Sequence, residues 1–419
     1  MKQLTAILLG AGQRGNAYSD YALQCPNELK IVGVAEPDDV RRKEYQDKHK
    51  LPESQCYKTW QEVFARDKWA DIVMICTQDT MHYEPAMAAI DKGYDILLEK
   101  PIAPTAKECK EIADAALAKN VKIIVCHGMR YTNVMKKLKE IIDSDEIGSI
   151  ASIVHCENVG DIHHSHSYVR GNWGNTERSS PMLLAKSCHD LDFIQWLVGE
   201  ECVRVSSFGS LSYFKKENCP DGAPPRCTDG CTIDCTYDAR KLYVESDSEW
   251  FRSVAAGHYR PTDEEVGEAI KTGPYGRCVF QCDNDVVDHQ VVSMEFKNDV
   301  TVIFSMSGLT PVINREIKVM CTRGIVTVCT DPPSLIVTKF VDPSKRESQK
   351  IEFPQESGHG GGDIRIMRTL CAFIRGDSGP SGLTEIGASA KNHMLCFAAE
   401  HSRLSNGAVV ELQNYIEEL

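Results

Sequence analysis

A short apolar strand that leads into a glycine-rich turn is the feature that most constrains this fold. Residues 7–9 (Ile-Leu-Leu) are followed directly by GAGQRG at 10–15, which fits the GxGxxG pattern of a dinucleotide-binding turn. The first glycine permits the tight turn, the second admits a pyrophosphate, and the third allows close packing of the next helix. The predicted cofactor contacts in this turn are Gly10, Gly12, Gln13, Arg14 and Gly15.

An acidic residue at the end of the second apolar strand supports this interpretation. Residues 31–35 are followed directly by Glu36, about 20 residues after the last glycine of the motif, which is the spacing of the residue that binds the adenosine ribose. A carboxylate there accepts hydrogen bonds from the ribose hydroxyls and repels a 2′-phosphate. Glu36 therefore favours NAD over NADP, although Arg41 and Arg42 lie close by and weaken that preference.

Length and charge narrow the functional class. A chain of 419 residues exceeds the size at which a single core keeps growing, so two domains are expected. The formal charge of -13 argues against nucleic acid or an anionic membrane as a partner and favours a small molecule. The sequence shows no membrane-spanning apolar run and no cleavable leader, so we predict a cytoplasmic protein.

The periodicity of the chain changes near residue 128. Before this point, predicted strands near 4–9, 29–35, 71–76, 95–98 and 122–126 alternate with helical periodicity, which predicts an α/β domain with a doubly wound parallel sheet. We therefore predict an NAD-binding Rossmann domain at 1–128 and a second α/β domain at 129–419 that contains an irregular cysteine-rich insertion at about 214–285. Later apolar runs predict an antiparallel meander, with strands at 286–296, 301–306, 313–321, 325–329 and 335–340.

Two further motifs carry a family resemblance. Glu99-Lys100-Pro101 follows an apolar strand, and GHGGGD occupies 358–363 near the C-terminus. With Thr77, Gln78 and His82 after the preceding strand, these residues resemble the Gfo/Idh/MocA oxidoreductases, which include glucose-fructose oxidoreductase and inositol dehydrogenase.

The resemblance covers nearly the whole chain and implies a fold, a cofactor site and an assembly. It implies a Rossmann domain followed by an α/β domain with a large open, mostly antiparallel sheet. It also implies a homo-dimer or homo-tetramer that buries the open face of that sheet. The further NAD contacts that it implies are Thr77, Gln78, His82, Glu99 and Lys100.

The resemblance implies oxidation or reduction of a secondary alcohol on a sugar, sugar acid or cyclitol. Moving hydride from a carbinol carbon to nicotinamide leaves a hydroxyl proton, so the site needs a base and a stabilising cation. In the family, the lysine at the position of Lys100 points at the reacting hydroxyl, and the histidine at the position of His189 is its acid/base partner. The alternatives are a solvated lysine and a structural histidine close to Asp192.

The sequence departs from the family pattern just before this histidine. Sugar and cyclitol dehydrogenases often carry Asp four residues earlier, but that position is Ala185, followed by Lys186. Either Lys186 enters the site as a second cation, suited to an acidic or strongly polarised substrate, or another carboxylate such as Asp190 takes the missing role.

A polar and aromatic segment at 163–173 precedes these residues. Its mixture of imidazole, guanidinium and aromatic side chains suits a carbohydrate, whereas a metal site built from its histidines is less favoured. The predicted substrate contacts are His166, Tyr168, Arg170, Trp173, Lys186 and, from the C-terminal segment, His359.

The chain contains 18 cysteines, which we expect to be reduced thiols in the cytosol. Cys227, Cys231 and Cys235 recur at every fourth position, and Cys282 is a candidate fourth ligand for zinc or an iron–sulfur cluster. The spacing is not the common CxxC, and in so cysteine-rich a chain chance clustering is the favoured interpretation.

Two functions other than net oxidation fit the same motifs. In a redox-neutral glycosidase or lyase, NAD would oxidise a sugar hydroxyl transiently, and hydride would return after elimination. In a noncatalytic sensor, NAD would be bound but not used, although the retention of both Lys100 and His189 argues against this function.

Overall fold

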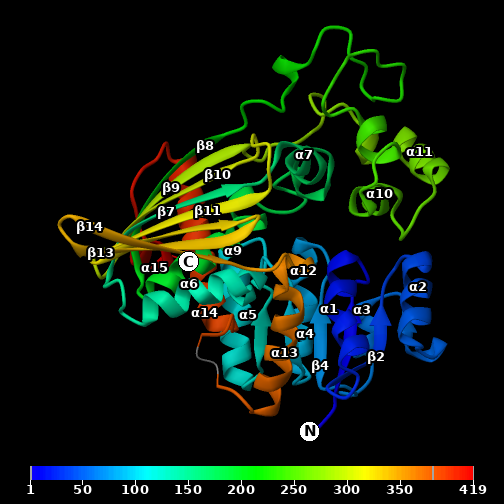
Figure 1. Ribbon diagram of the computed structural model, residues 1–419. Coiled ribbons are helices and arrows are strands. Elements are labelled where there is room, and N and C mark those ends of the chain that lie inside the picture. The colour runs from blue at the N-terminus through cyan, green and yellow to red at the C-terminus, as the bar shows by residue number, and fades with distance from the viewer. Residues whose placement is uncertain (1, 380–381, 419) are drawn as a thin grey trace.

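The computed structural model describes residues 2–379 and 382–418. It contains two β-sheets, each packed against helices (Figure 1). The first sheet has six parallel strands in the order β3-β2-β1-β4-β5-β6. Its strands are β1 (Leu4–Leu9), β2 (Leu29–Ala35), β3 (Cys56–Tyr57), β4 (Ile72–Ile75), β5 (Asp95–Leu98) and β6 (Ile123–Val125). The doubly wound parallel sheet predicted from the sequence is confirmed.

Helices cover both faces of this sheet because its central strands are apolar on both sides. All four residues of β4 are buried, and so are the last four of β1. The covering helices from the first part of the chain are α1 (Gln13–Gln24), α2 (Asp39–His49), α3 (Trp60–Phe64), α4 (Tyr83–Asp91) and α5 (Ala106–Lys119).

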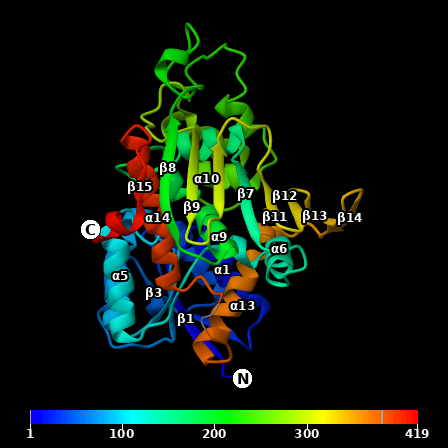
Figure 2. The ribbon, with the colours of Figure 1, turned by 90° about the vertical axis from the view of Figure 1, so that its left-hand side faces the viewer.

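Two helices from the far end of the chain complete the same core. Helix α13 (Gly362–Arg375) places Ile366 and Leu370 among the buried side chains of β1 and α1. Helix α14 (Ile386–Leu404) contributes Ile386 and Met394 to the other face, while Leu395 belongs to the core of the second sheet. Figure 2 shows α14 running beside both α5 and β8. The boundary at residue 128 remains a prediction.

The second sheet is large, mixed and mostly antiparallel, as predicted. Its nine strands lie in the order β14-β13-β12-β11-β7-β10-β9-β8-β15. They are β7 (Ile150–Asn158), β8 (Cys202–Ser210), β9 (His289–Phe296), β10 (Thr301–Ser307), β11 (Asn314–Cys321), β12 (Gly324–Thr330), β13 (Pro333–Asp342), β14 (Lys345–Glu352) and β15 (Val410–Glu411). Along β9, exposed and buried residues alternate, so one face of the sheet is open.

The predicted meander is wrong in one respect. Strands β10 and β11 are not neighbours, because β7 lies between them, parallel to β10 and antiparallel to β11. The strands β3, β8, β14 and β15 were also not predicted. Of these, β3 and β15 are only two residues long, and β14 is almost fully exposed.

The remaining helices lie around this sheet and in the insertion. In the first group are α6 (Asn133–Asp143), α7 (Asp161–His164), α8 (Met182–Ala185), α9 (Cys188–Val198), α12 (Ser357–Gly360) and α15 (Leu412–Glu417). The insertion is less irregular than expected, because it holds α10 (Glu249–Ala256) and α11 (Asp263–Thr272), which Figure 1 shows on the same side as α1 and α2. No helix within the described ranges has the length and apolar character to cross a membrane.

Candidate active site

The glycine turn has the geometry that a dinucleotide needs. Gly10 has a φ of +90°, and a Cβ on it would lie 2.6 Å from the carbonyl oxygen of Cys76. A Cβ on Gly15 would lie 2.3 Å from the carbonyl oxygen of Gly10, so only glycine fits there. Nothing lies within 4 Å of a Cβ built on Gly12, which leaves this backbone open to a pyrophosphate. The turn therefore fits NAD.

Glu36 is held in place beside this turn. Its carboxylate accepts hydrogen bonds from the backbone N–H of Ala11 at 2.8 Å and of Asp38 at 3.0 Å, and the side chain is almost fully buried. Arg41 lies 3.3 Å from the same carboxylate. The acid predicted to select NAD is thus a fixed negative charge with one arginine next to it.

Arg14, predicted as a cofactor contact, lies in an ion network with Glu99 and Asp363. Its guanidinium donates to Glu99 at 3.0 Å and to Asp363 at 2.7 and 3.1 Å. Tyr18 donates to Glu99 at 2.8 Å, and His359 lies 3.1 Å from Asp363. Burial raises the pKa of Glu99, but the positive charges of Arg14 and Lys100 lower it below its usual value, so this carboxylate is ionised. The network joins the glycine turn to the C-terminal segment.

The segment after β4 also makes contacts within the protein. The Gln78 side chain accepts a hydrogen bond from Asn172 at 2.6 Å, and the Thr77 hydroxyl donates to the carbonyl of Met81 at 3.2 Å. His82 is fully buried, with its ring nitrogens 2.8 Å from the Pro101 carbonyl and 3.2 Å from the Thr77 carbonyl. His82 therefore joins the segment after β4 to the segment after β5 and positions both.

Lys100 and His189 come together at the carboxyl edge of the parallel sheet. The Lys100 amine donates a hydrogen bond to the carbonyl of Ala185 at 2.6 Å. Ala185 comes four residues before His189 in the chain. Burial lowers the pKa of His189 well below its usual value, and the charge of Lys100 lowers it further. The imidazole is therefore neutral at physiological pH and can accept a proton. In the described structure its Nδ1 has no hydrogen-bond partner.

The structure answers the question raised by Ala185. The carboxylate of Asp190 is fully buried, 2.8 Å from the His155 ring and 2.9 Å from Arg315, so it does not face the site. Lys186 lies 3.8 Å from Glu157, which also accepts a hydrogen bond from Arg315 at 2.6 Å. Burial lowers the pKa of Lys186 to about 8, and the charge of Lys100 contributes in the same direction. Lys186 is thus a second amine close to Lys100.

Two of the residues predicted to bind substrate, His166 and Arg170, are directed into the insertion. The segment at 165–170 is a π-helical turn, not the polar loop expected, and it is buried throughout. His166 stacks on Tyr275 at 4.8 Å inside the insertion. Arg170 points into the insertion, whereas Tyr168 is buried next to the site, with its ring 6.2 Å from that of Trp173. The sequence pattern shows that these side chains are polar, but it does not show that residues of the insertion bury them.

Trp173 and His359 remain near the site. Trp173 is partly buried and donates to Asp79 at 3.1 Å, which links the second domain to the segment after β4. The ring of His359 lies 6.5 Å from that of His189, and its side chain is 56% exposed. Both can therefore line the space above the glycine turn.

Sequence analysis missed several residues around this space. The backbone carbonyl of Trp250 in α10 accepts a hydrogen bond from the Gln13 side-chain amide at 3.5 Å, and the Trp250 ring lies 5.0 Å from that of His163. His127 is buried 5.5 Å from the His189 ring, and neither of its nitrogens has a described partner. Glu157 was detectable in principle as the acidic residue of a largely apolar strand, whereas Arg315 gave no such signal, because Glu316 and Lys318 lie in the same strand.

The cysteines of the insertion do not form a metal site as they stand. Among the described residues, no group of three or more Cys, His, Asp or Glu side chains lies close enough together to hold an ion. Cys227, Cys231 and Cys235 do line one pocket, but its fourth cysteine is Cys278 and not the predicted Cys282.

Comparison with known proteins agrees with this geometry. The model of an oxidoreductase family with an NAD-binding Rossmann fold, GFO_IDH_MocA, matches residues 4–127, and the GFO/IDH/MocA C-terminal domain matches residues 135–327. The chain belongs to the Gfo/Idh/MocA family. It is therefore an oxidoreductase of that family with an NAD-binding domain.

Individual relatives are distant. The putative oxidoreductase YteT of Bacillus subtilis is 23% identical over 312 residues, which is 72% of each chain. An inositol 2-dehydrogenase of Salmonella typhimurium is 28% identical over 208 residues, which is 49% of this chain and 57% of that protein. The solved structure of a levoglucosan dehydrogenase with NADH and L-sorbose superposes with a TM-score of 0.72. It is 18% identical and covers 98% of this chain and 99% of the other. At that identity the likeness shows the fold alone.

Proposed function

We propose that this Gfo/Idh/MocA protein oxidises a secondary alcohol of a sugar, sugar acid or cyclitol, with NAD as hydride acceptor. The observation that carries the proposal is the convergence of Lys100 and His189 at the carboxyl edge of the Rossmann sheet. Ligands of parallel α/β sheets bind at that edge. The relatives named inositol and levoglucosan dehydrogenases support a polyhydroxylated substrate.

The protein residues divide the work of the reaction. When NAD is bound, its oxidised nicotinamide ring accepts the hydride from the carbinol carbon. Lys100, oriented by the Ala185 carbonyl, is the proposed base for the hydroxyl proton, and neutral His189 can pass that proton on. Lys186 adds a cation that can stabilise the developing alkoxide or a carboxylate on the substrate.

The preference for NAD rests on Glu36. The carboxylate is fixed by two backbone N–H groups beside the glycine turn, and its charge would repel a 2′-phosphate bound there. We propose NAD as the working cofactor, with Gly12 and Glu36 as its principal contacts and Gln13, Thr77 and Gln78 at the edge of the site.

Lys100→Met tests the proposed chemistry. We expect turnover to fall by roughly 10²- to 10⁴-fold, the usual contribution of a general base, while NAD binding stays intact. A panel of sugars, sugar acids and cyclitols is assayed by NADH absorbance, with the exposed Lys119→Met as control. Undiminished turnover in Lys100→Met refutes the assigned role, and product formation without net NADH favours the redox-neutral reaction.

We also propose that a homo-oligomer covers the open face of the second sheet. Large apolar side chains are exposed there, including Phe208, Val291 and Ile303. Ile303→Asp is expected to lower the mass measured by light scattering, whereas an unchanged mass contradicts this interface.

A further inference from the structure

The six cysteines of the insertion gather in one place although they come from separate segments. They are Cys219, Cys227, Cys231, Cys235, Cys278 and Cys282. An antiparallel bridge between Arg226 and Arg277 brings two of these segments together. The backbone N–H of Cys227 donates to the Gly276 carbonyl at 2.9 Å, and that of Cys278 donates to the Pro225 carbonyl at 2.8 Å. The backbone therefore fixes these two cysteines next to each other.

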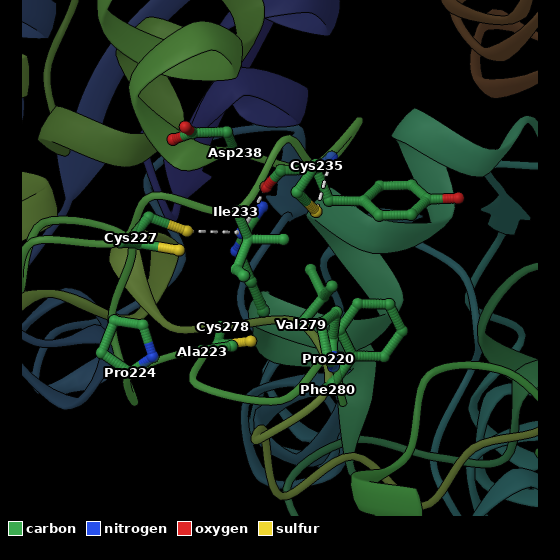
Figure 3. A pocket seen from close by; sticks show the side chains of 13 residues that line it. Pro220, Ala223, Pro224, Cys227, Ile233, Cys235, Asp238, Cys278, Val279 and Phe280 are labelled. Carbon is green, nitrogen blue, oxygen red and sulfur yellow. Dashed lines mark hydrogen bonds between the residues drawn. The ribbon is translucent and has the colours of Figure 1, made fainter. Parts of the chain in front are cut away.

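A small cavity lies between four of these cysteines. Figure 3 shows Cys227, Cys235 and Cys278 around it, and Cys231 also lines it. The cavity has a volume of about 20 Å³, and roughly 10–15 Å³ suffices for one water molecule. The space is thus of the size of a single water or ion.

Arg170 brings a buried charge to this cavity without an acidic partner. The side chain is 1% exposed and lines the cavity. Its guanidinium donates to the carbonyls of Arg277 at 2.7 Å and Tyr237 at 2.6 Å. No carboxylate among the described residues forms an ion pair with it, and its Nη1 has no partner. Asp238 also lines the cavity, but its carboxylate pairs with Arg240 at 2.6 Å. A buried cation is costly unless a negative charge compensates it, and Arg170 has no such charge of its own.

The sulfurs themselves are the groups that could supply this charge. Arg170 also donates to the Cys227 sulfur at 3.6 Å, and the backbone N–H of Tyr237 donates to the Cys235 sulfur at 3.4 Å. A neutral thiol is a weak acceptor, whereas hydrogen bonds to an ionised acceptor are about twice as strong. Two of the four sulfurs therefore already accept hydrogen bonds that would strengthen on ionisation.

The other two cysteines are arranged differently. The Cys282 thiol donates to the Cys278 carbonyl at 3.3 Å, which requires that it keep its proton. Cys219 accepts from the Gln281 side chain at 3.4 Å and is not part of the cavity wall. Neither is therefore suited to share an ion with the other four.

We propose that Cys227, Cys231, Cys235 and Cys278 bind one thiophilic divalent cation, with Zn²⁺ as the probe, and that Arg170 offsets the charge of the centre. Zn²⁺ prefers four tetrahedral thiolates with Zn–S distances of about 2.3 Å. Since no three of the described side chains are that close, the cysteines must turn toward the cavity when the ion binds. Each of the four thiols then releases one proton to solvent, and the centre carries two negative charges beside one guanidinium. Such a site would stabilise an insertion that has little regular structure near it.

The test measures metal in the full-length protein, purified under reducing conditions without chelators and then reconstituted with Zn²⁺. We expect one zinc per chain in the wild type. Cys278→Ser and Cys227→Ser are expected to lose it, whereas the matched control Cys282→Ser keeps it. Retention by Cys278→Ser together with loss by Cys282→Ser would overturn the assigned ligand set.

A second measurement covers variants that fail to fold. Wild-type protein reconstituted with Co²⁺ should show sulfur-to-cobalt charge-transfer absorption, and a mercurial reagent should release the zinc while the chain remains intact. A wild type without bound zinc and without that absorption refutes the proposal, as does iron with acid-labile sulfide in place of a single ion. None of these readouts depends on turnover, so they do not test the proposed dehydrogenase reaction.

Discussion

Glu36→Gln gives a direct test of cofactor selection, because it removes a negative charge and keeps the shape of the side chain. The remaining amide oxygen can still accept the hydrogen bond from the Ala11 N–H, so the glycine turn should keep its conformation. Arg41, which lies 3.3 Å from the wild-type carboxylate, would become free to bind a 2′-phosphate. The variant should therefore bind NADPH better relative to NADH.

The expected size of the change follows from the two charges. A carboxylate and a phosphate charge about 5 Å apart repel by roughly 3 kcal/mol at an effective dielectric constant of about 20. The positive charge of Arg41 offsets part of this repulsion, because the guanidinium lies 3.3 Å from the carboxylate. Its side chain is 38% exposed, so water screens this charge in part. We expect a net change of about 2–3 kcal/mol, which corresponds to roughly a 30- to 160-fold shift in the ratio of the two dissociation constants.

The assay needs no substrate. NADH and NADPH are titrated into the wild type, Glu36→Gln and the control Glu53→Gln, which lies on an exposed turn, and binding is followed by nicotinamide fluorescence. The control should keep the wild-type ratio. A ratio within about 3-fold of wild type in Glu36→Gln would refute the argument that this carboxylate selects the cofactor.

Three further predictions concern the turn, a buried ion pair and pH. Gly12→Ala should leave the melting temperature unchanged but weaken NADH binding, whereas Gly15→Ala should cost about 1–3 kcal/mol of stability by overpacking; equal melting temperatures would contradict this contrast. Asp192→Asn leaves Arg130 buried without its partner at 2.5 Å, so urea unfolding should show a loss of about 3–5 kcal/mol, partly recovered in a double variant with Arg130→Met. Burial lowers the pKa of His127, His189 and His393, so below about pH 6.5 the unfolded chain binds more protons than the folded protein. The free energy of unfolding should therefore fall on acidification. A flat profile between about pH 7 and about pH 5 would refute this.

The Rossmann sheet could be predicted almost strand by strand, because each long strand is an apolar run between polar turns. The predicted strand at 29–35 coincides with β2, and that at 4–9 coincides with β1. The two-residue strand β3 has no periodicity to detect. The position of β7 between β10 and β11 depends on pairing across more than a hundred residues, for which the local sequence carries no signal.

The site was predictable where a motif ties a residue type to a backbone position. Gly10, Glu36 and Lys100 each follow directly from a strand end, and the structure places all three at the carboxyl edge of the sheet. His166 and Arg170 were misplaced because a cluster of polar and aromatic residues looks the same in a binding loop and in a buried π-helical turn. Their covering partners come from the insertion, whose fold could not be inferred from spacing.

The contribution of α13 and α14 to the first core has a consequence for how the protein is made. Strands β1 to β6 leave the ribosome long before residues 362–404, which cover part of their apolar surface. Until those residues emerge, side chains such as Leu8 and Val125 lack part of their final packing. The nascent N-terminal half therefore exposes apolar surface until residues 362–404 have been made. Chains in this state are the ones that chaperones bind.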